Sequence, residues 1–507
     1  MSVSELVAQC ARRYADKPAL IFKDQEISFA RLADRVGRYA ALFQQVGIHK
    51  GDRIGFQLPN GPEAVYCYLA CFYVGAVGVP LDFMLKEDEV RSCLGHAEVK
   101  LFIYQPRRAA DPTKWRAALP ALRSVLTVGD GQPAELDLNK LADQAGPECR
   151  PVETADADPA LIMYTSGTTG KPKGILLNTR HLTGSPAAMK HFVDLTDRDV
   201  KLAAIPFSHI GGFIYIQNCI HFGITLVIMD RFQPFEFLAN VERYRVTCFH
   251  IVPPMYNALL TLKEIERFDL STLRWVVVFG APSSPDILKR FHQYIPNAKL
   301  LNGWGMTETS PPNTVTPLDS DNIQSVGKPA PHCEIRVVDE DGRECPAGTI
   351  GEIVISGWIV MDGYYKDPEE TAQVLRDGWL HTGDLGRFDT DGFLYIVGRK
   401  KEMIKVAGQI VYAPEVEAAL LKHEQVAEAA VVGVEDELKG EAVRAFVVLH
   451  ADADVTADDL RGYCREHLAN FKVPQAITIK DGLPKNRTGK IDKAALKEQF
   501  SVAGGAG

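Results

Sequence analysis

The chain has 507 residues, of which 65 are acidic and 56 basic, and a formal net charge of −9 at pH 7. This length allows two to four domains or subdomains with a large core, and the charge gives no indication of a broad basic surface for nucleic acid. The ten cysteines include no Cys-x-x-Cys pair, which favours reduced, mostly buried thiols over a disulfide framework or a zinc site.

The N-terminus carries charge throughout and has no apolar core of signal-peptide length, so we expect a cytoplasmic protein. The uncharged stretch from Ala64 to Leu81 is long enough to raise the question of a membrane span. Gly75, Gly78 and Pro80 interrupt its second half, which favours a buried helix followed by a short buried strand. Peripheral membrane contact stays open for a lipid substrate, and the sequence does not predict an oligomeric state.

Strands and helices alternate along the first part of the chain. The patterns predict a hairpin, a helix capped by Ser28, a strand, two further helices and another strand; these are Ala19–Phe22 with Glu26–Ser28, the helix ended by Gly47, Arg53–Leu58, Pro62–Val74, the helix from Lys86, and Val99–Tyr104. Such alternation indicates stacked βα units and a mainly parallel sheet.

The segment Tyr164–Gly174, YTSGTTGKPKG, follows the apolar run Ala160–Met163. Its glycines let backbone N–H groups turn inward, its hydroxyls donate to phosphate oxygens, and its lysines neutralise phosphate charge. The segment does not match the P-loop of NTPases, because Thr165 stands five residues before Gly170 and Pro172 follows Lys171. We interpret it as a polyphosphate cradle rather than an ordinary surface loop.

Three later apolar runs each end in a polar or glycine-rich turn: Cys248–Val252, Trp275–Phe279 and Leu300–Leu301, the last before Asn302-Gly303-Trp304. Ligands collect beyond the carboxyl ends of strands in open α/β sheets, so these turns are expected to face the phosphate segment. Short strands and turns from Val326 predict a small β-rich subdomain, and the pattern beyond Gly398 predicts a compact α+β unit.

Five further motifs complete a resemblance that covers nearly the whole chain: PFSHIGG at Pro206–Gly212, GWGMTET at Gly303–Thr309, HTGDLG at His381–Gly386, GRKKEMIKVAG at Gly398–Gly408 and PKNRTGK at Pro484–Lys490. Together with YTSGTTGKPKG they resemble the adenylate-forming superfamily, which includes acyl-CoA synthetases, beetle luciferases and peptide-synthetase adenylation domains. The resemblance implies an α/β fold with a large N-terminal domain of stacked βα subdomains and a small β-rich subdomain (1–397), a hinge (398–401) and a small mobile α+β C-terminal domain (402–507).

The resemblance also assigns a nucleotide site that binds ATP or AMP. Its residues are expected to be Thr165, Ser166, Gly167, Thr168, Thr169 and Lys173 at the phosphates, Gly280, Ala281 and Pro282 along the adenine, Gly303, Trp304, Gly305 and Thr307 in GWGMTET, and Asp384 with Arg399 at the ribose. Trp304 stands where the family usually has tyrosine, and an aromatic plane there suits stacking on adenine. Glu308 is the expected ligand of the Mg²⁺ that accompanies ATP.

The acyl pocket implied by the resemblance comprises Phe207, His209, Gly211, Phe213, Ser310 and Pro311. A lone histidine is more often structural, so the role of His209 rests on the family match. Lys490 matches the family's adenylation lysine, and a cation that reaches both the α-phosphate and the departing pyrophosphate is the expected catalyst. Lys401 matches the hinge, and Lys405 a lysine of the second half-reaction. Thr307 and Glu308 complete the expected catalytic set.

The resemblance implies an AMP-forming acyl-CoA synthetase that uses ATP, Mg²⁺ and CoA, and we expect a medium- or long-chain fatty acid as substrate. Alternatives are an aryl-CoA ligase, a stand-alone enzyme that loads a carrier protein, a luciferase-type oxygenase and a non-catalytic nucleotide sensor. The sensor is disfavoured because Lys490, Glu308 and Asp384 are all present. Which acid is activated does not follow from a single sequence.

Overall fold

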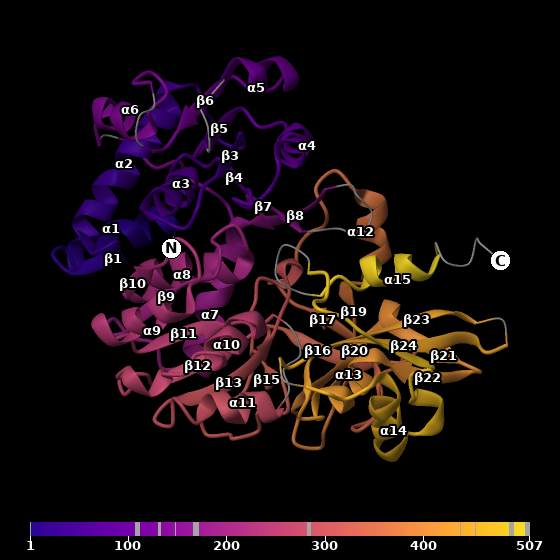
Figure 1. The fold of residues 1–507 in the computed structure, drawn as a ribbon. Coiled ribbons are helices and arrows are strands. Elements are labelled where there is room, and N and C mark those ends of the chain that lie inside the picture. The colour runs from indigo at the N-terminus through magenta and orange to yellow at the C-terminus, as the bar shows by residue number, and fades with distance from the viewer. Residues whose placement is uncertain are drawn as a thin grey trace. The chain divides into compact units, whose positions relative to one another are not determined.

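The computed structural model describes residues 2–106, 112–129, 133–147, 149–165, 172–280, 285–436, 438–451, 453–485 and 491–501 (Figure 1). The described chain divides into two compact units, one within 2–334 and 355–380 and the other within 335–354 and 381–501. The boundaries expected for a mobile domain, with a hinge at 398–401, stay a prediction.

A six-stranded sheet lies in the first unit. Its strands, in spatial order, are β6 (Ser124–Thr127), β5 (Leu101–Tyr104), β3 (Arg53–Gln57), β4 (Val77–Pro80), β7 (Pro159–Thr165) and β8 (Lys173–Asn178). All neighbours are parallel except β7 and β8. Helices α4 (Glu87–Ala97), α5 (Pro112–Ala118) and α6 (Leu138–Ala145) belong to the same part of the chain.

A nine-stranded sheet forms the rest of the first unit's framework. Its spatial order is β15 (Lys328–Pro329), β14 (Thr314–Val315), β13 (Lys299–Trp304), β12 (Trp275–Val278), β11 (Cys248–Ile251), β9 (Val200–Ala203), β10 (Thr225–Ile228), β1 (Pro18–Phe22) and β2 (Gln25–Ser28). The run from β13 to β1 is parallel, and antiparallel pairs close both edges. The helices in the same stretches of chain are α1 (Val3–Arg13), α2 (Phe29–Gln45), α7 (Gly184–Phe192), α8 (Ile210–Phe222), α9 (Pro234–Arg243), α10 (Pro253–Leu260) and α11 (Pro285–His292).

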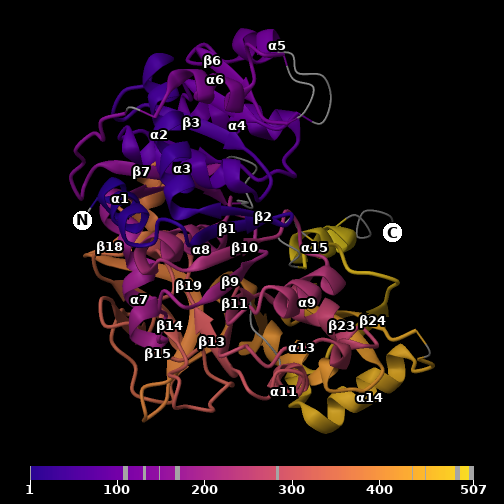
Figure 2. The same cartoon turned by 90° about the vertical axis from the view of Figure 1, so that its left-hand side faces the viewer.

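Helix α3 (Pro62–Tyr73) lies between the two sheets, as Figures 1 and 2 both show. Pro62 occupies its first turn, where a missing N–H costs nothing. Tyr68 stacks on Phe213 of α8 with ring centroids 4.9 Å apart, and every α3 residue except Glu63 is buried. The uncharged stretch from Ala64 is therefore a core helix followed by strand β4, as its glycines and proline predicted.

Two further sheets follow along the chain. The first has the order β16 (Glu334–Val338), β17 (Gly351–Ser356), β19 (Trp379–Phe388), β18 (Leu375–Arg376), with β20 (Leu394–Arg399) paired to β19; helix α12 (Pro368–Val374) precedes β18. The second has the order β22 (Gln409–Tyr412), β21 (Met403–Val406), β24 (Gly440–Leu449), β23 (Val426–Asp436), with β25 (Ala476–Ile479) paired to β24.

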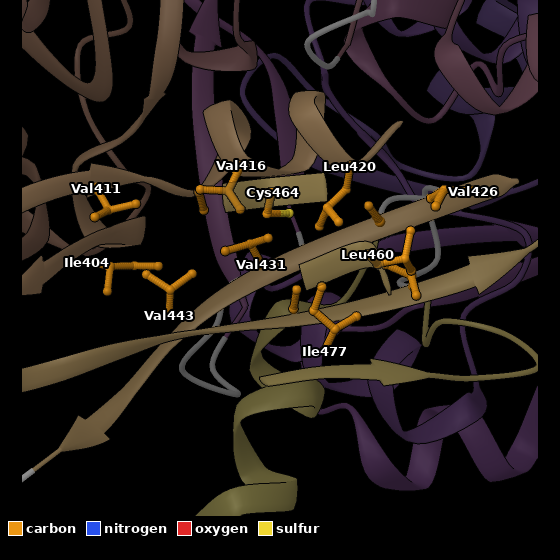
Figure 3. Packing of buried hydrophobic residues seen from close by; sticks show 14 of the residues in the cluster. Ile404, Val411, Val416, Leu420, Val426, Val431, Val443, Leu460, Cys464 and Ile477 are labelled. Carbon is orange, nitrogen blue, oxygen red and sulfur yellow. The ribbon is translucent and has the colours of Figure 1, made fainter. Parts of the chain in front are cut away.

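Helices α13 (Ala413–Leu421), α14 (Ala457–His467) and α15 (Lys493–Ser501) complete the second unit. The aliphatic side chains of α13, including Val416 and Leu420, pack on Val431 of β23 and Val443 of β24 (Figure 3). This part of the second unit therefore has its own hydrophobic core, as the α+β pattern beyond Gly398 predicted.

The α/β class, the parallel sheets and the N-terminal hairpin are confirmed, and all ten cysteines are free thiols. Two local predictions were wrong. Asn302–Trp304 is not a turn but the continuation of β13, because Gly303 and Trp304 pair with β14. The glycines on either side of Asp384 in HTGDLG predict a turn, but Asp384 lies within strand β19, because it pairs with Arg399 of β20. No helix among the described residues is long and apolar enough to span a membrane.

Candidate active site

The phosphate segment joins two antiparallel strands. Strand β7 ends at the exposed Thr165, which is in register with Lys173 at the start of β8. The Tyr164 hydroxyl donates to the Cys93 carbonyl at 3.2 Å and lies 2.8 Å from His96 Nδ1, so the end of β7 is tied to α4. Ser166, Gly167, Thr168 and Thr169 lie outside the described residues.

Lys173 belongs to a cluster of charged and aromatic side chains. Its ammonium group forms an ion pair with Glu370 of α12 and lies 5.6 Å from the ring centroid of Tyr364. The Tyr364 hydroxyl donates to Glu308 Oε1 at 3.3 Å. Burial and the negative charge of Glu308 both raise the pKa of Tyr364, which keeps the phenol protonated as a donor. The cluster thus connects a candidate phosphate ligand with the candidate metal ligand.

Glu308 lies in a 3₁₀ turn, η3 (Thr307–Thr309), that follows the end of β13. Two glycines before this turn allow close packing. A Cβ on Gly303 would lie 2.2 Å from the ring of Phe279, and one on Gly305 would lie 2.4 Å from Pro311. Trp304, between them, is only 9% exposed, and Thr307 is half-buried beside Glu308. A larger residue at either glycine would therefore force Phe279 or Pro311 to shift.

The carboxyl end of the neighbouring strand β12 leads to Gly280, whose φ of +96° is in the region that favours glycine. Ala281 and Pro282 lie outside the described residues. The end of β13 and that of β12 are adjacent in the sheet, so the expected adenine segment begins beside the strand that carries Trp304.

His209 is the N-cap residue of α8, and its Nε2 lies 3.1 Å from Asp82 Oδ2. Asp82 follows β4, and its other carboxylate oxygen accepts from the Met84 N–H at 2.8 Å. Asn60 holds the loop that precedes α8: it donates to the Ile205 carbonyl at 3.0 Å and accepts from the Phe207 N–H at 2.7 Å. Sequence reasoning missed Asp82, although an acidic residue after a buried parallel strand was the available signal.

The other expected acyl-pocket residues differ in their surroundings. Phe207 and Phe213 are each 2% exposed, and Phe213 packs between aromatic rings of α3. Gly211 is half-buried, with Ile205 nearest to the position of a Cβ. Ser310 and Pro311 are buried directly after η3. Phe207 and Phe213 are therefore packed in the core, whereas the half-buried His209 remains accessible.

In the second unit Asp384 and Arg399 form an ion pair between β19 and β20, with Arg399 Nε 2.7 Å from Asp384 Oδ1. Asp384 is 5% exposed, whereas the Arg399 side chain is 46% exposed. Lys401 is exposed in the short 3₁₀ helix η4 (Lys400–Glu402), and Lys405 is exposed on β21. Lys490 lies outside the described residues.

Among the described residues, no group of three or more His, Cys, Asp or Glu side chains is placed to hold a metal ion. Magnesium is commonly bound by one or two carboxylates together with substrate phosphates and waters. The Glu308 carboxylate, which Tyr364 connects to Lys173, fits that mode of binding.

Two family models match the chain: the AMP-binding enzyme over residues 7–365 and the AMP-binding enzyme C-terminal domain over residues 415–490. The chain is 36% identical to a feruloyl-CoA synthase from Amycolatopsis sp, with 94% of each chain covered. It is 32% identical to a long-chain-fatty-acid–CoA ligase from Bacillus subtilis, with 98% of this chain and 94% of the other covered. The structure of ATP-bound MatB from Rhodopseudomonas palustris aligns with a TM-score of 0.89 at 30% identity over 99% of both chains. The chain therefore belongs to the AMP-binding enzyme family, as an AMP-forming acyl-CoA synthetase of the adenylate-forming superfamily.

Proposed function

We propose that this protein converts an apolar carboxylic acid, ATP and CoA into an acyl-CoA thioester, AMP and pyrophosphate. The observation that carries the proposal is that one chain matches both the AMP-binding domain and its C-terminal partner domain. The match to the C-terminal domain covers residues 415–490. It ends at Lys490, the residue expected to catalyse adenylation.

In the first half-reaction a carboxylate oxygen attacks the α-phosphorus of ATP, and the bond from that phosphorus to pyrophosphate breaks. The charge that develops is spread over the α-phosphate and the leaving group, so cations near both accelerate the step. Lys490 is proposed for this role, with Lys173 and the hydroxyls of 165–169 holding the phosphates. Asp384, with Arg399, is proposed to accept the ribose hydroxyls.

His209 is proposed to orient the acid for this attack. Its ring nitrogen Nε2 faces the Asp82 carboxylate at 3.1 Å, which leaves Nδ1 to meet the substrate. Magnesium would be held by Glu308 together with phosphate oxygens, and when bound it neutralises charge on the triphosphate. Thr307 beside Glu308 is proposed to donate to a phosphate.

In the second half-reaction the sulfur of CoA attacks the acyl carbon, the carbon–oxygen bond to AMP breaks, and the thiol proton is released. AMP leaves with the oxygen that attacked the phosphorus. Rotation of the C-terminal domain about Lys401 is proposed to bring Lys405 to the site for this step, which lets one site run two reactions.

For the acid itself we propose a medium- or long-chain fatty acid, supported by the likeness to the Bacillus subtilis fatty-acid ligase. An aryl acid is the second candidate, and the higher identity to the feruloyl-CoA synthase favours it specifically. Both classes of acid carry a largely apolar body, which the half-buried Ile210 and Gly211 after His209 suit equally.

The test is pyrophosphate release with MgATP across aliphatic acids of two to eighteen carbons, benzoates and cinnamates, each with and without CoA. Pyrophosphate release that CoA accelerates for one class of acids would identify CoA as the acceptor and that class as the substrate. A slow release that CoA does not change would indicate a carrier protein as acceptor, and light emission or oxygen consumption would indicate a luciferase-type oxygenase. The absence of pyrophosphate release with every acid would contradict the proposal.

A further inference from the structure

The segment 361–371 joins the phosphate segment to the turn that carries Glu308. On one side the Met361 N–H donates to the Glu308 carbonyl at 2.8 Å. On the other side it bonds to strand β8, because the Tyr365 N–H donates to the Gly174 carbonyl at 2.7 Å and the Leu176 N–H donates to the Gly363 carbonyl at 3.3 Å. These backbone hydrogen bonds fix the main chain of Tyr364 between strand β8 and the turn η3.

Tyr364 is itself held by the start of α12. Its N–H donates to Thr371 Oγ1 at 2.9 Å, and the Thr371 hydroxyl donates to the Asp367 carbonyl at 2.7 Å. Gly363 has a φ of +154°, and a Cβ there would lie 2.7 Å from Thr371. The backbone around Tyr364 is therefore constrained on both sides, which suits a side chain that has to aim accurately.

The side chain of Tyr364 contacts both charged groups of the cluster described above. The ring face lies 5.6 Å from Lys173 Nζ, a cation–π distance, and the hydroxyl donates to Glu308 Oε1 at 3.3 Å. One residue thus orients a candidate phosphate ligand with its ring and the candidate magnesium ligand with its hydroxyl.

Glu370 supplies the negative charge that faces Lys173. The two side chains form an ion pair and are only 24% and 27% exposed, so the pair is partly shielded from water. Glu370 is fixed at the N-terminus of α12, where its N–H donates to Asp367 Oδ1 at 3.0 Å. A phosphate group that approaches Lys173 must compete with this carboxylate.

We propose that Tyr364 is a positioning residue that aligns Glu308 for the magnesium–nucleotide complex, and that Glu370 is a counter-ion which Lys173 exchanges for a phosphate when ATP binds. The proposal rests on the nucleotide roles proposed above for Lys173 and Glu308. Neither Tyr364 nor Glu370 belongs to the phosphate segment or to the site residues expected from the sequence.

The first test is Tyr364→Phe, which removes the hydroxyl and keeps the ring. Calorimetric titration with ATP, with and without Mg²⁺, measures the role directly. Magnesium-free affinity should stay within about twofold of wild type, while the gain in affinity that Mg²⁺ provides should fall about tenfold, because a hydrogen bond to a carboxylate is lost. The matched control is Tyr365→Phe, since this neighbouring ring lies against His96 instead; it should behave as wild type.

An unchanged magnesium effect in Tyr364→Phe would overturn the positioning role. An equal loss with and without Mg²⁺ would also overturn it, because that result indicates general damage to the site. Failure of the wild-type protein to bind ATP at all would contradict the proposed function together with this proposal.

The second test is Glu370→Gln, which keeps the shape of the side chain and removes its charge. Without a competing carboxylate, magnesium-free ATP should bind about threefold to tenfold more tightly. The control is Glu369→Gln, an exposed neighbour on the same helix, for which no change is expected. Unchanged or weaker ATP binding by Glu370→Gln would overturn the counter-ion role.

Discussion

Lys201 is a fully buried lysine in strand β9 of the nine-stranded sheet. Its ammonium nitrogen lies 3.2 Å from His250 Nε2 and within 5.4 Å of the ring centroids of Tyr215 and Trp275. Burial lowers the pKa of Lys201 from its ordinary 10.5 to about 8. Burial lowers the pKa of His250 as well, so the imidazole accepts the hydrogen bond in its neutral form.

The consequence is a stability that depends on pH. Between about pH 8 and 10.5 the unfolded chain keeps a proton on Lys201 that the folded chain has released, so the free energy of unfolding rises with pH across this window. Below pH 8 both states are protonated and the full penalty is present. At about 1.4 kcal/mol per pKa unit, this penalty is on the order of 3 kcal/mol.

We predict that Lys201→Met removes this dependence. The free energy of unfolding of the variant minus that of the wild type, measured in urea, should fall by on the order of 3 kcal/mol from pH 7.5 to pH 10.5. The shift does not depend on the packing of methionine, which is the same at both pH values. Lys263→Met, at an exposed lysine, is the control and should show no shift. A difference that stays constant with pH would refute the inference that Lys201 titrates in the core.

Three further predictions concern the proposed chemistry. Asp384→Ala should raise the KM for ATP about tenfold and change the free energy of unfolding by less than about 1 kcal/mol, because the guanidinium of Arg399 is half exposed; an unchanged KM for ATP would argue against the ribose role. Lys490→Ala should slow acyl-adenylate formation on the order of a hundredfold or more while thioester formation from supplied acyl-adenylate stays largely intact, and equal loss in both steps would contradict the division between them. Asp82→Ala should raise the KM for the acid more than that for ATP, and Asp82→Asn should restore most of the loss. The effects of Asp82→Ala and His209→Ala should not add in the double variant; simple additivity would contradict the inference that Asp82 acts through His209.

Local pattern was enough to predict most elements of the fold. The uncharged stretch from Ala64 carried both the length of a helix and the glycines that end it, so α3 and β4 followed from sequence alone. The placement of Asp384 could not be predicted, because a glycine-flanked acidic residue is typical of a turn. Only its pairing with Arg399, fifteen residues later, makes it part of β19.

Partners distant in sequence could not be predicted for the site. His209 and Asp82 are 127 residues apart, and Lys173 and Glu370 are 197 apart, so neither pair leaves a local signal. The resemblance assigns Phe213 to the acyl pocket, and its stacking on Tyr68 of α3 is a second long-range contact that the sequence does not show. The complete burial of Lys201 likewise depends on neighbours from α8, β11 and β12.

In the proposed mechanism the acid is activated by attack of its own oxygen on the α-phosphorus of ATP. The most direct measurement supplies an acid labelled with ¹⁸O in both carboxylate oxygens, together with MgATP and CoA, and determines the masses of the products. The mechanism predicts one ¹⁸O in AMP, one in the thioester and none in pyrophosphate. Label in inorganic phosphate, with ADP as the nucleotide product, or unlabelled AMP would contradict activation through an acyl-adenylate.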